Sequence, residues 1–158
     1  MTAPKAQEGI LVVVEDPGWR KIRGLLPRLK RAAAAAAKVV KFRGASSLTV
    51  LLSSDRKLKS LNREFRGLDK PTNVLSFPTP PSQPGYRGDI ALALGTTRRE
   101  AKQAGKSLAD HATHLVVHGV LHLAGHDHAR ARDAKVMEKL EIDILRRLGI
   151  ANPYEVAK

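Results

Sequence analysis

The chain has 158 residues, of which 42% are hydrophobic and 27% charged, so it is long enough and apolar enough to bury one core. It contains no cysteine, which excludes disulfides, cysteine-ligated zinc and a cysteine nucleophile. No run of about 18 apolar residues is present, so no membrane-spanning helix is expected. The net charge of +13 favours a polyanionic partner, and nucleic acid is favoured over an anionic membrane surface. The alternative is that the basic residues only form a solvated helix face.

The basic residues are concentrated in the first half of the chain. Residues 1–80 hold 16 basic and 6 acidic residues, and no acidic residue lies between Asp16 and Asp55. Aromatic residues make up only 4% of the chain, so the sequence shows no stacking platform for single-stranded nucleic acid. Residues 1–9 lack the apolar centre of a signal peptide and predict a flexible tail, followed by a single domain over residues 10–154 of a cytoplasmic protein.

The predicted elements begin with a strand at residues 10–14, a short β-branched run. Asp16 and Pro17 are typical of a helix start, and the helix is expected to reach about residue 40, bent or restarted at Pro27. Hydrophobic patterns and turn residues then predict strands at 48–52, 74–77 and 89–94, a loop at 78–88, and helices at 55–65, 96–103, 108–124 and 132–148.

Three of the six histidines carry the strongest pattern in the chain. His118, His122 and His128 have H-x3-H-x5-H spacing, and the first two are one helical turn apart, so their rings project from the same side. Gly125 can end the helix in a left-handed conformation and return the chain, so that the third ring approaches from outside. Three imidazoles without a fourth protein ligand are typical of a catalytic zinc site with an open coordination position.

The helix that bears these histidines is apolar around most of its circumference, so we expect it to be buried at the centre of the fold. Its histidine stripe must line a cleft or be hydrogen-bonded, because an unsatisfied buried imidazole is costly. Besides the predicted ligands we interpret His114 as a hydrogen-bonded core residue and His111 as a cleft-wall or surface residue. His126 either faces solvent or supports the site, and Asp127 is either a partner of a ligand imidazole or a cap of the turn.

Zinc peptidases share this histidine spacing but differ at one decisive position. They need a glutamate directly after the first histidine as the general base, and this chain has Gly119 there. Without that carboxylate the metal alone must lower the pKa of bound water, towards about 7. Such a site suits a substrate whose transition state carries anionic charge, for example a phosphodiester.

Four blocks of sequence, which lie between residues 48 and 154, carry a family resemblance. They are residues 61–78 (LNREFRGLDKPTNVLSFP), 88–90 (GDI), 118–128 (HGVLHLAGHDH) and 148–154 (LGIANPY). On these blocks the chain resembles the YbeY family of bacterial rRNA maturation factors. The resemblance implies an α+β fold, a single domain with a small mixed four-stranded sheet, about five flanking helices and the metal ligands on a central buried helix.

The same resemblance implies a single-strand-specific, metal-dependent endoribonuclease that acts in small-subunit rRNA 3′-end maturation and in ribosome quality control. Its partners would be RNA and the ribosomal small subunit. Neither DNA nor a membrane is expected as a partner. One Zn²⁺ would be held by His118, His122 and His128. The family's functional arginine falls on Arg66, whose guanidinium can bind phosphate in a bidentate way and stabilise charge that develops on it.

Two other functions are kept as alternatives. One is a non-catalytic, zinc-containing ribosome assembly or RNA-binding factor, and the other, less favoured, is a zinc peptidase. Within the leading hypothesis, nitrogen ligands suit zinc and also nickel, copper and iron. Either water or the RNA 2′-hydroxyl can serve as the nucleophile at such a site.

Overall fold

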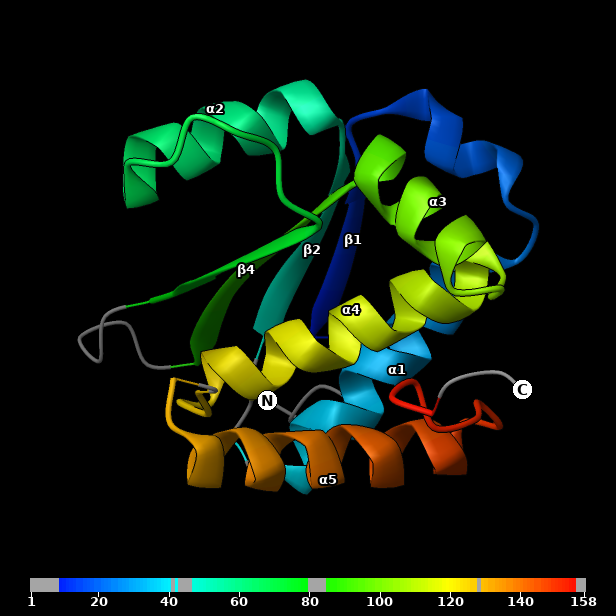
Figure 1. Ribbon diagram of the computed structural model, residues 1–158, viewed down its shortest axis with the longest axis vertical. Coiled ribbons are helices and arrows are strands. Elements are labelled where there is room, and N and C mark those ends of the chain that lie inside the picture. Colours follow the sequence, from blue (N-terminus) through cyan, green and yellow to red (C-terminus); the bar gives the residue numbers. More distant parts are fainter. Residues whose placement is uncertain (1–8, 41, 43–46, 80–84, 128, 156–158) are drawn as a thin grey trace, which may run out of the picture.

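The computed structural model describes residues 9–40, 42, 47–79, 85–127 and 129–155, and it contains one mixed four-stranded sheet (Figure 1). The strands are β1 (Ile10–Val14), β2 (Ser47–Ser53), β3 (Val74–Pro78) and β4 (Tyr86–Ala93), in the spatial order β1-β2-β4-β3. β1, β2 and β4 are parallel, whereas β3 pairs antiparallel with β4 and forms one edge of the sheet. The predicted tail, apart from Gly9, lies outside the described residues.

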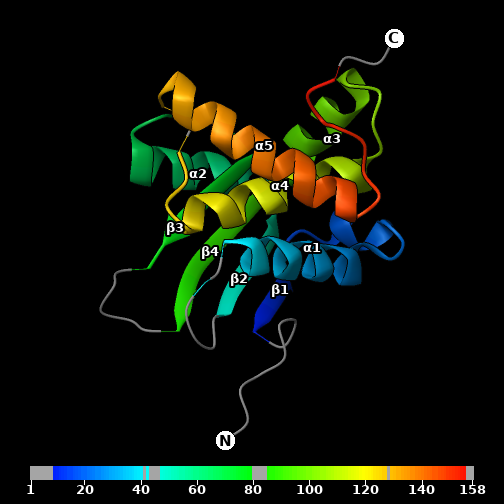
Figure 2. The same cartoon turned by 90° about the horizontal axis from the view of Figure 1, so that it is seen from below.

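Helices cover both faces of this sheet. The helices are α1 (Leu25–Val39), α2 (Asp55–Arg66), α3 (Leu94–Gln103), α4 (Leu108–Leu123) and α5 (Ala131–Arg147). α1, α4 and α5 lie on one face, with α4 between the sheet and α5, and α2 lies on the other face (Figure 1, Figure 2). This arrangement confirms the expected α+β architecture. Over the described ranges, every helix is too short or too polar to cross a membrane.

The central helix expected from the sequence is α4. Its residues Val116, Val120 and Leu121 have no exposed surface, and they belong to the same hydrophobic cluster as Ile90 and Leu92 of β4. Full burial of each such side chain stabilises the fold by about 1.5–3 kcal/mol. Packing against the sheet on one side and α5 on the other therefore fixes the position of α4 and of the histidines that it carries.

Gly119 allows α4 to approach the sheet closely. A Cβ atom at this position would lie 2.7 Å from Ile90 Cγ2 and 3.1 Å from Ile90 Cδ1, so a larger side chain would have to displace the buried Ile90 side chain of β4. The Oγ of Ser76 on β3 also donates a hydrogen bond to the carbonyl oxygen of Gly119 at 3.2 Å. The glycine that distinguishes this chain from the zinc peptidases therefore has a packing role.

Two element boundaries differ from the sequence prediction by more than two residues. The first predicted helix is divided into a 3-10 turn at Pro17–Lys21 and α1, and the break lies at Gly24, which has φ of 71°, rather than at Pro27. Pro27 lies in the first turn of α1, where its missing N–H has no helical partner to lose. β4 begins at Tyr86, inside the predicted loop at 78–88, because a bulge lets its first residues pair with the start of β2.

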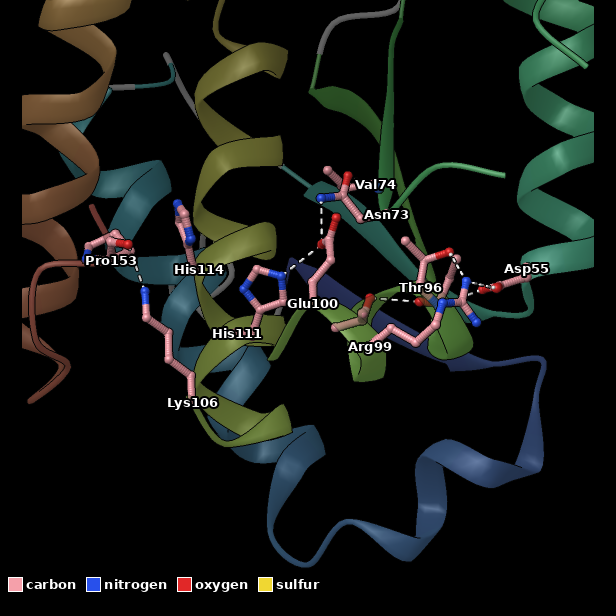
Figure 3. Close-up of polar contacts among 12 residues, drawn as sticks. Asp55, Asn73, Val74, Thr96, Arg99, Glu100, Lys106, His111, His114 and Pro153 are labelled. Atoms are coloured by element: carbon pink, nitrogen blue, oxygen red, sulfur yellow. Dashed lines mark hydrogen bonds and ion pairs between the residues drawn. The ribbon is translucent and has the colours of Figure 1, made fainter. Parts of the chain in front are cut away.

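Two hydrogen-bonded residues fix the beginning of α2. Ser54 caps the helix by accepting a hydrogen bond from the N–H of Lys57 at 3.1 Å. Asp55 accepts hydrogen bonds from the N–H of Thr96 at 2.8 Å and from Nη2 of Arg99 at 2.9 Å, which joins α2 to α3 (Figure 3). Burial alone would raise the pKa of Asp55, but these hydrogen bonds together outweigh it and lower the pKa of that carboxyl.

The packing at Gly119 predicts the sign of a substitution. Helix propensity alone favours alanine over glycine by about 1 kcal/mol, but the contact with Ile90 should make Gly119→Ala lower the free energy of unfolding by about 1–3 kcal/mol. Urea denaturation measures this difference. The same substitution should cost less in an Ile90→Ala background, and an equal cost in both backgrounds would show that Ile90 is not responsible.

The hydrogen bonds of Asp55 predict a pH dependence of stability. Because the pKa of Asp55 is lower in the folded chain than its ordinary value of 3.8, its carboxylate stabilises the fold above that pH, and this contribution is lost as the pH falls. The stability difference between the wild type and Asp55→Asn should therefore shrink below about pH 4. Asp69→Asn, which alters a 64% exposed side chain, is the control. A difference for Asp55→Asn that stays constant from neutral to acidic pH would contradict this account.

Candidate functional site

Four histidines of α4 form a continuous stripe along one side of the helix, as their spacing predicted. The ring centroids are 6.1 Å apart for His111 and His114, 6.4 Å apart for His114 and His118, and 4.6 Å apart for His118 and His122. Each ring has a polar partner, either a carboxylate or the neighbouring imidazole. The stripe is therefore a polar seam on an otherwise apolar helix.

His118 and His122 bring two ring nitrogens face to face. Their Nε2 atoms are 3.1 Å apart. Two imidazole nitrogens that both carry lone pairs repel each other at this separation unless a proton or a cation lies between them. In a tetrahedral zinc site with Zn–N distances of about 2.0–2.1 Å, ligand nitrogens are ~3.3 Å apart. The pair therefore fits two positions of the predicted metal site.

The third predicted ligand, His128, lies outside the described residues, and within the described ranges no three histidine or carboxylate side chains form a metal-binding group. The chain does turn after α4 as expected. Gly125 has φ of 95°, and its N–H donates to the carbonyl oxygen of His122 at 3.0 Å while that of His126 donates to Leu121 at 3.0 Å, a common way to end a helix. Asp127 Oδ1 accepts a hydrogen bond from the N–H of Ala129 at 3.3 Å, in keeping with the capping interpretation.

A buried glutamate on α5 orients the rings. Glu141 has no exposed surface, and its Oε1 lies 2.5 Å from His118 Nδ1 while its Oε2 lies 2.8 Å from His114 Nε2. Burial alone would raise the pKa of Glu141, but hydrogen bonds from these two histidines and a tyrosine lower it to about 2. The ionised carboxylate can only accept hydrogen bonds, so His118 Nδ1 donates, and in a neutral imidazole the lone pair is then on Nε2, the atom that faces His122.

Tyr154, in the segment after α5, completes the surroundings of Glu141. Its hydroxyl donates a hydrogen bond to Glu141 Oε2, and its ring lies edge-on to His114 with the centroids 5.6 Å apart. Burial and the neighbouring carboxylates raise the pKa of Tyr154, so the hydroxyl keeps the proton that it donates. Lys106 holds the same segment through a hydrogen bond from Nζ to the carbonyl oxygen of Pro153 at 2.6 Å (Figure 3).

A second carboxylate holds the other end of the stripe. Glu100 Oε1 accepts a hydrogen bond from Asn73 Nδ2 at 2.9 Å and lies 2.9 Å from His111 Nε2 (Figure 3). Asn73 Oδ1 in turn accepts a hydrogen bond from the N–H of Val74 at 2.7 Å. These contacts link α3, α4 and the beginning of β3, and they give His111 a role in fixing the wall beside the stripe.

One end of the stripe, at His118 and His122, opens into a cleft of about 390 Å³. His118 and His122 line it from α4, and Arg66 lines it from the last residue of α2. The other lining residues come from the loop before β3, from β3 itself and from the turn after α4, and they are Thr72, Asn73, Val74, Leu75, Ser76, Pro78 and Asp127. The structure thus brings Arg66 to the same cleft as two of the three predicted ligands.

The loop after α2 fixes the backbone position of Arg66. Gly67 follows it with φ of 71°, and its N–H donates to the carbonyl oxygen of Arg63 at 3.1 Å. Asn62 is buried, and its Nδ2 donates to the carbonyl oxygen of Lys70 at 2.9 Å, which ties the far end of the loop back to the helix. Arg66 is therefore an exposed side chain on a fixed backbone.

Sequence analysis did not single out Glu141 or Tyr154 as site residues. A signal for Glu141 was present, because buried positions of α5 recur at Met137 and Ile144, and Glu141 occupies the helical position between them. A charged residue at such a position needs partners. Tyr154 lies in a block that the family resemblance covers, but its contact with Glu141 depends on the path of the chain after α5, which no local pattern gives.

Comparisons with known proteins place this site in a family context. Residues 21–149 match the family model described as Endoribonuclease YbeY. The proteins named Endoribonuclease YbeY from Chelativorans sp. (strain BNC1) and Maricaulis maris (strain MCS10) are 51% and 43% identical over 143 residues, covering 87% and 90% of this chain and 86% and 89% of theirs. The solution structure of a Thermotoga maritima protein is similar with a TM-score of 0.62 and 29% identity over 88% of both chains.

Proposed function

Because the chain belongs to the YbeY family of endoribonucleases, we propose that it cleaves single-stranded RNA at the cleft that Arg66 shares with His118 and His122. Family membership makes the chain a hydrolytic nuclease with RNA as its substrate. The proposal adds small-subunit rRNA 3′-end maturation and ribosome quality control as its roles, with the ribosomal small subunit as partner. The observation that carries the site is the 3.1 Å approach of two histidine Nε2 atoms beside Arg66.

We further propose that His118, His122 and His128 hold one Zn²⁺ ion. Metal dependence is general in this family. The facing nitrogens of His118 and His122 support two ligand positions, and the spacing after the Gly125 turn supports the third. When bound, the cation polarises a phosphoryl oxygen or lowers the pKa of a water molecule.

The chain's own residues supply position and charge. Glu141 fixes the tautomer of His118, so a nitrogen lone pair points towards His122 and the cleft. Arg66 has five N–H donors in a planar fork that matches phosphate oxygens, and it stabilises the negative charge that develops there in the transition state. The net charge of +13 attracts the RNA backbone, and this attraction weakens as salt is added.

The alternative of a zinc peptidase has no support in this site. The position of the peptidase general base is Gly119, and a Cβ atom there would lie 2.7 Å from Ile90. A non-catalytic role in ribosome assembly is separated from cleavage by the following experiment.

Cleavage of a single-stranded RNA that spans the 3′ end of small-subunit rRNA tests the proposed function. Arg66→Ala should lower kcat by about 10²–10³, because it removes one stabilising donor from the transition state, while bound metal is retained. His118→Ala should lose both activity and metal, as measured by elemental analysis. A complementary strand that makes the RNA double-stranded should suppress cleavage by the wild type.

Lys57→Ala is the matched control for Arg66→Ala. It removes one positive charge from the same helix, but Lys57 is exposed, does not line the cleft and lies on another face of α2. It should cleave at nearly the wild-type kcat. Equal activity of the wild type, Arg66→Ala and His118→Ala would assign the cleavage to a contaminating nuclease and reject this site. Inactive wild-type protein that still restores ribosome maturation in a deletion strain would favour the non-catalytic role.

The hydrogen bond from His118 to Glu141 predicts an effect on metal affinity. Glu141→Gln keeps the shape of the side chain but removes the charge that holds His118 in one tautomer, so zinc affinity should fall by about 10–100-fold. Competition with a coloured chelator measures the affinity. Asp133→Asn, an exposed position of the same helix, should leave it unchanged. Equal zinc affinity of Glu141→Gln and the wild type, with both proteins folded, would reject the role of Glu141.

A further inference from the structure

An exposed aromatic pair lies beside the cleft. Phe65, the residue before Arg66 on α2, is 61% exposed. Its ring packs edge-to-face against Phe77 of β3, with the centroids 5.2 Å apart and the planes at 62°. Phe77 lies between Ser76 and Pro78, which both line the cleft. Each ring of the pair is therefore attached to a backbone segment that also forms the cleft wall.

The pair and the histidines lie on opposite sides of β3. Ser76 points towards α4, where it donates to Gly119, so Phe77 points to the other face of the sheet, where it packs with Leu58 and Leu75. β3 is an edge strand, and no described strand lies beyond it. A polymer bound in the cleft can therefore pass around this edge to reach Phe65.

The charges around the pair favour a nucleic acid strand over an apolar partner. Lys59, Arg63 and Arg66 are exposed and lie four and three residues apart, so they share one face of α2. Such a cationic stripe attracts a phosphate backbone. Proteins that hold single strands combine a cationic track with exposed aromatic rings on which bases stack. The combination is found here although the composition of the chain gave no sign of it.

We propose that Phe65, supported by Phe77, stacks on an unpaired nucleobase that flanks the scissile phosphate of the RNA. This inference rests on the proposed RNA cleavage at the cleft. Only an unpaired base can turn its face to the ring, so the contact selects single strands over duplexes. Because every base has an aromatic face, the contact selects little for sequence. Arg66 binds phosphate on one side of the edge strand while the adjacent Phe65 holds a base on the other.

Abasic scanning tests the proposal. A set of fluorescent single-stranded RNAs of one sequence, each with one base removed near the cleavage site, is bound to the metal-loaded protein. Affinity is measured by anisotropy, and cleavage of the same samples is followed on gels. Phe65→Ala should weaken binding of the intact RNA by about 5- to 150-fold, the range of stacking on one base. Phe65→Tyr keeps a ring and should bind as the wild type does.

The abasic RNAs separate stacking from a general structural effect. At the position that stacks on Phe65, base removal should weaken RNA binding by the wild type but should not weaken RNA binding by Phe65→Ala any further. At the other positions, base removal should change the affinity of the two proteins by the same factor. Val136→Ala, which trims a 50% exposed side chain on α5, is the control and should bind normally. Wild-type affinity in Phe65→Ala, or an equal loss at every abasic position, would overturn the proposal. Absence of wild-type cleavage with base-dependent binding intact would reject the proposed function alone.

Discussion

The buried charge of Glu141 is the constraint on which the site depends. A carboxylate without any exposed surface is strongly destabilising unless hydrogen bonds compensate it. Here His114 and His118 of α4 and the hydroxyl of Tyr154 supply these bonds. Because all three donors must reach one carboxylate, α5 and the segment after it are held in one register against α4. The interaction that joins these helices therefore also aims the Nε2 atom of His118.

On the opposite side of α4, close packing rather than charge determines which side chains the helix can carry. Gly119 leaves no space for a side chain between the helix and Ile90, so no carboxylate from this position can act on a substrate. Besides Asp127, the charged side chain that lines the cleft in the described part of the chain is Arg66, a cation suited to an anionic substrate. The chemistry that the cleft favours is thus a consequence of how closely a helix lies on a sheet.

The sequence predicted features that repeat at short range and missed those that depend on distant segments. The stripe that contains His118 and His122 follows from helical periodicity, and the position of α4 follows from its apolar circumference. The helix break at Gly24 was assigned to Pro27, because a proline in a first turn and one in a helix interior look alike before the helix start is known. Helical spacing alone does not reveal the exposure of Phe65, because it places this residue on the same face of α2 as the buried Leu58 and Asn62.

The link between Tyr154 and Glu141 couples a chain segment to the cleft without direct contact between them. Short, partly exposed segments such as residues 149–155 open locally at a lower free-energy cost than packed helices. An opening of this segment would remove one hydrogen-bond donor from the Glu141 carboxylate. A ligand that binds His118 more strongly when its ring is held by Glu141 favours the closed segment, by thermodynamic linkage. Such a ligand must therefore also slow hydrogen exchange at the backbone amides of this segment.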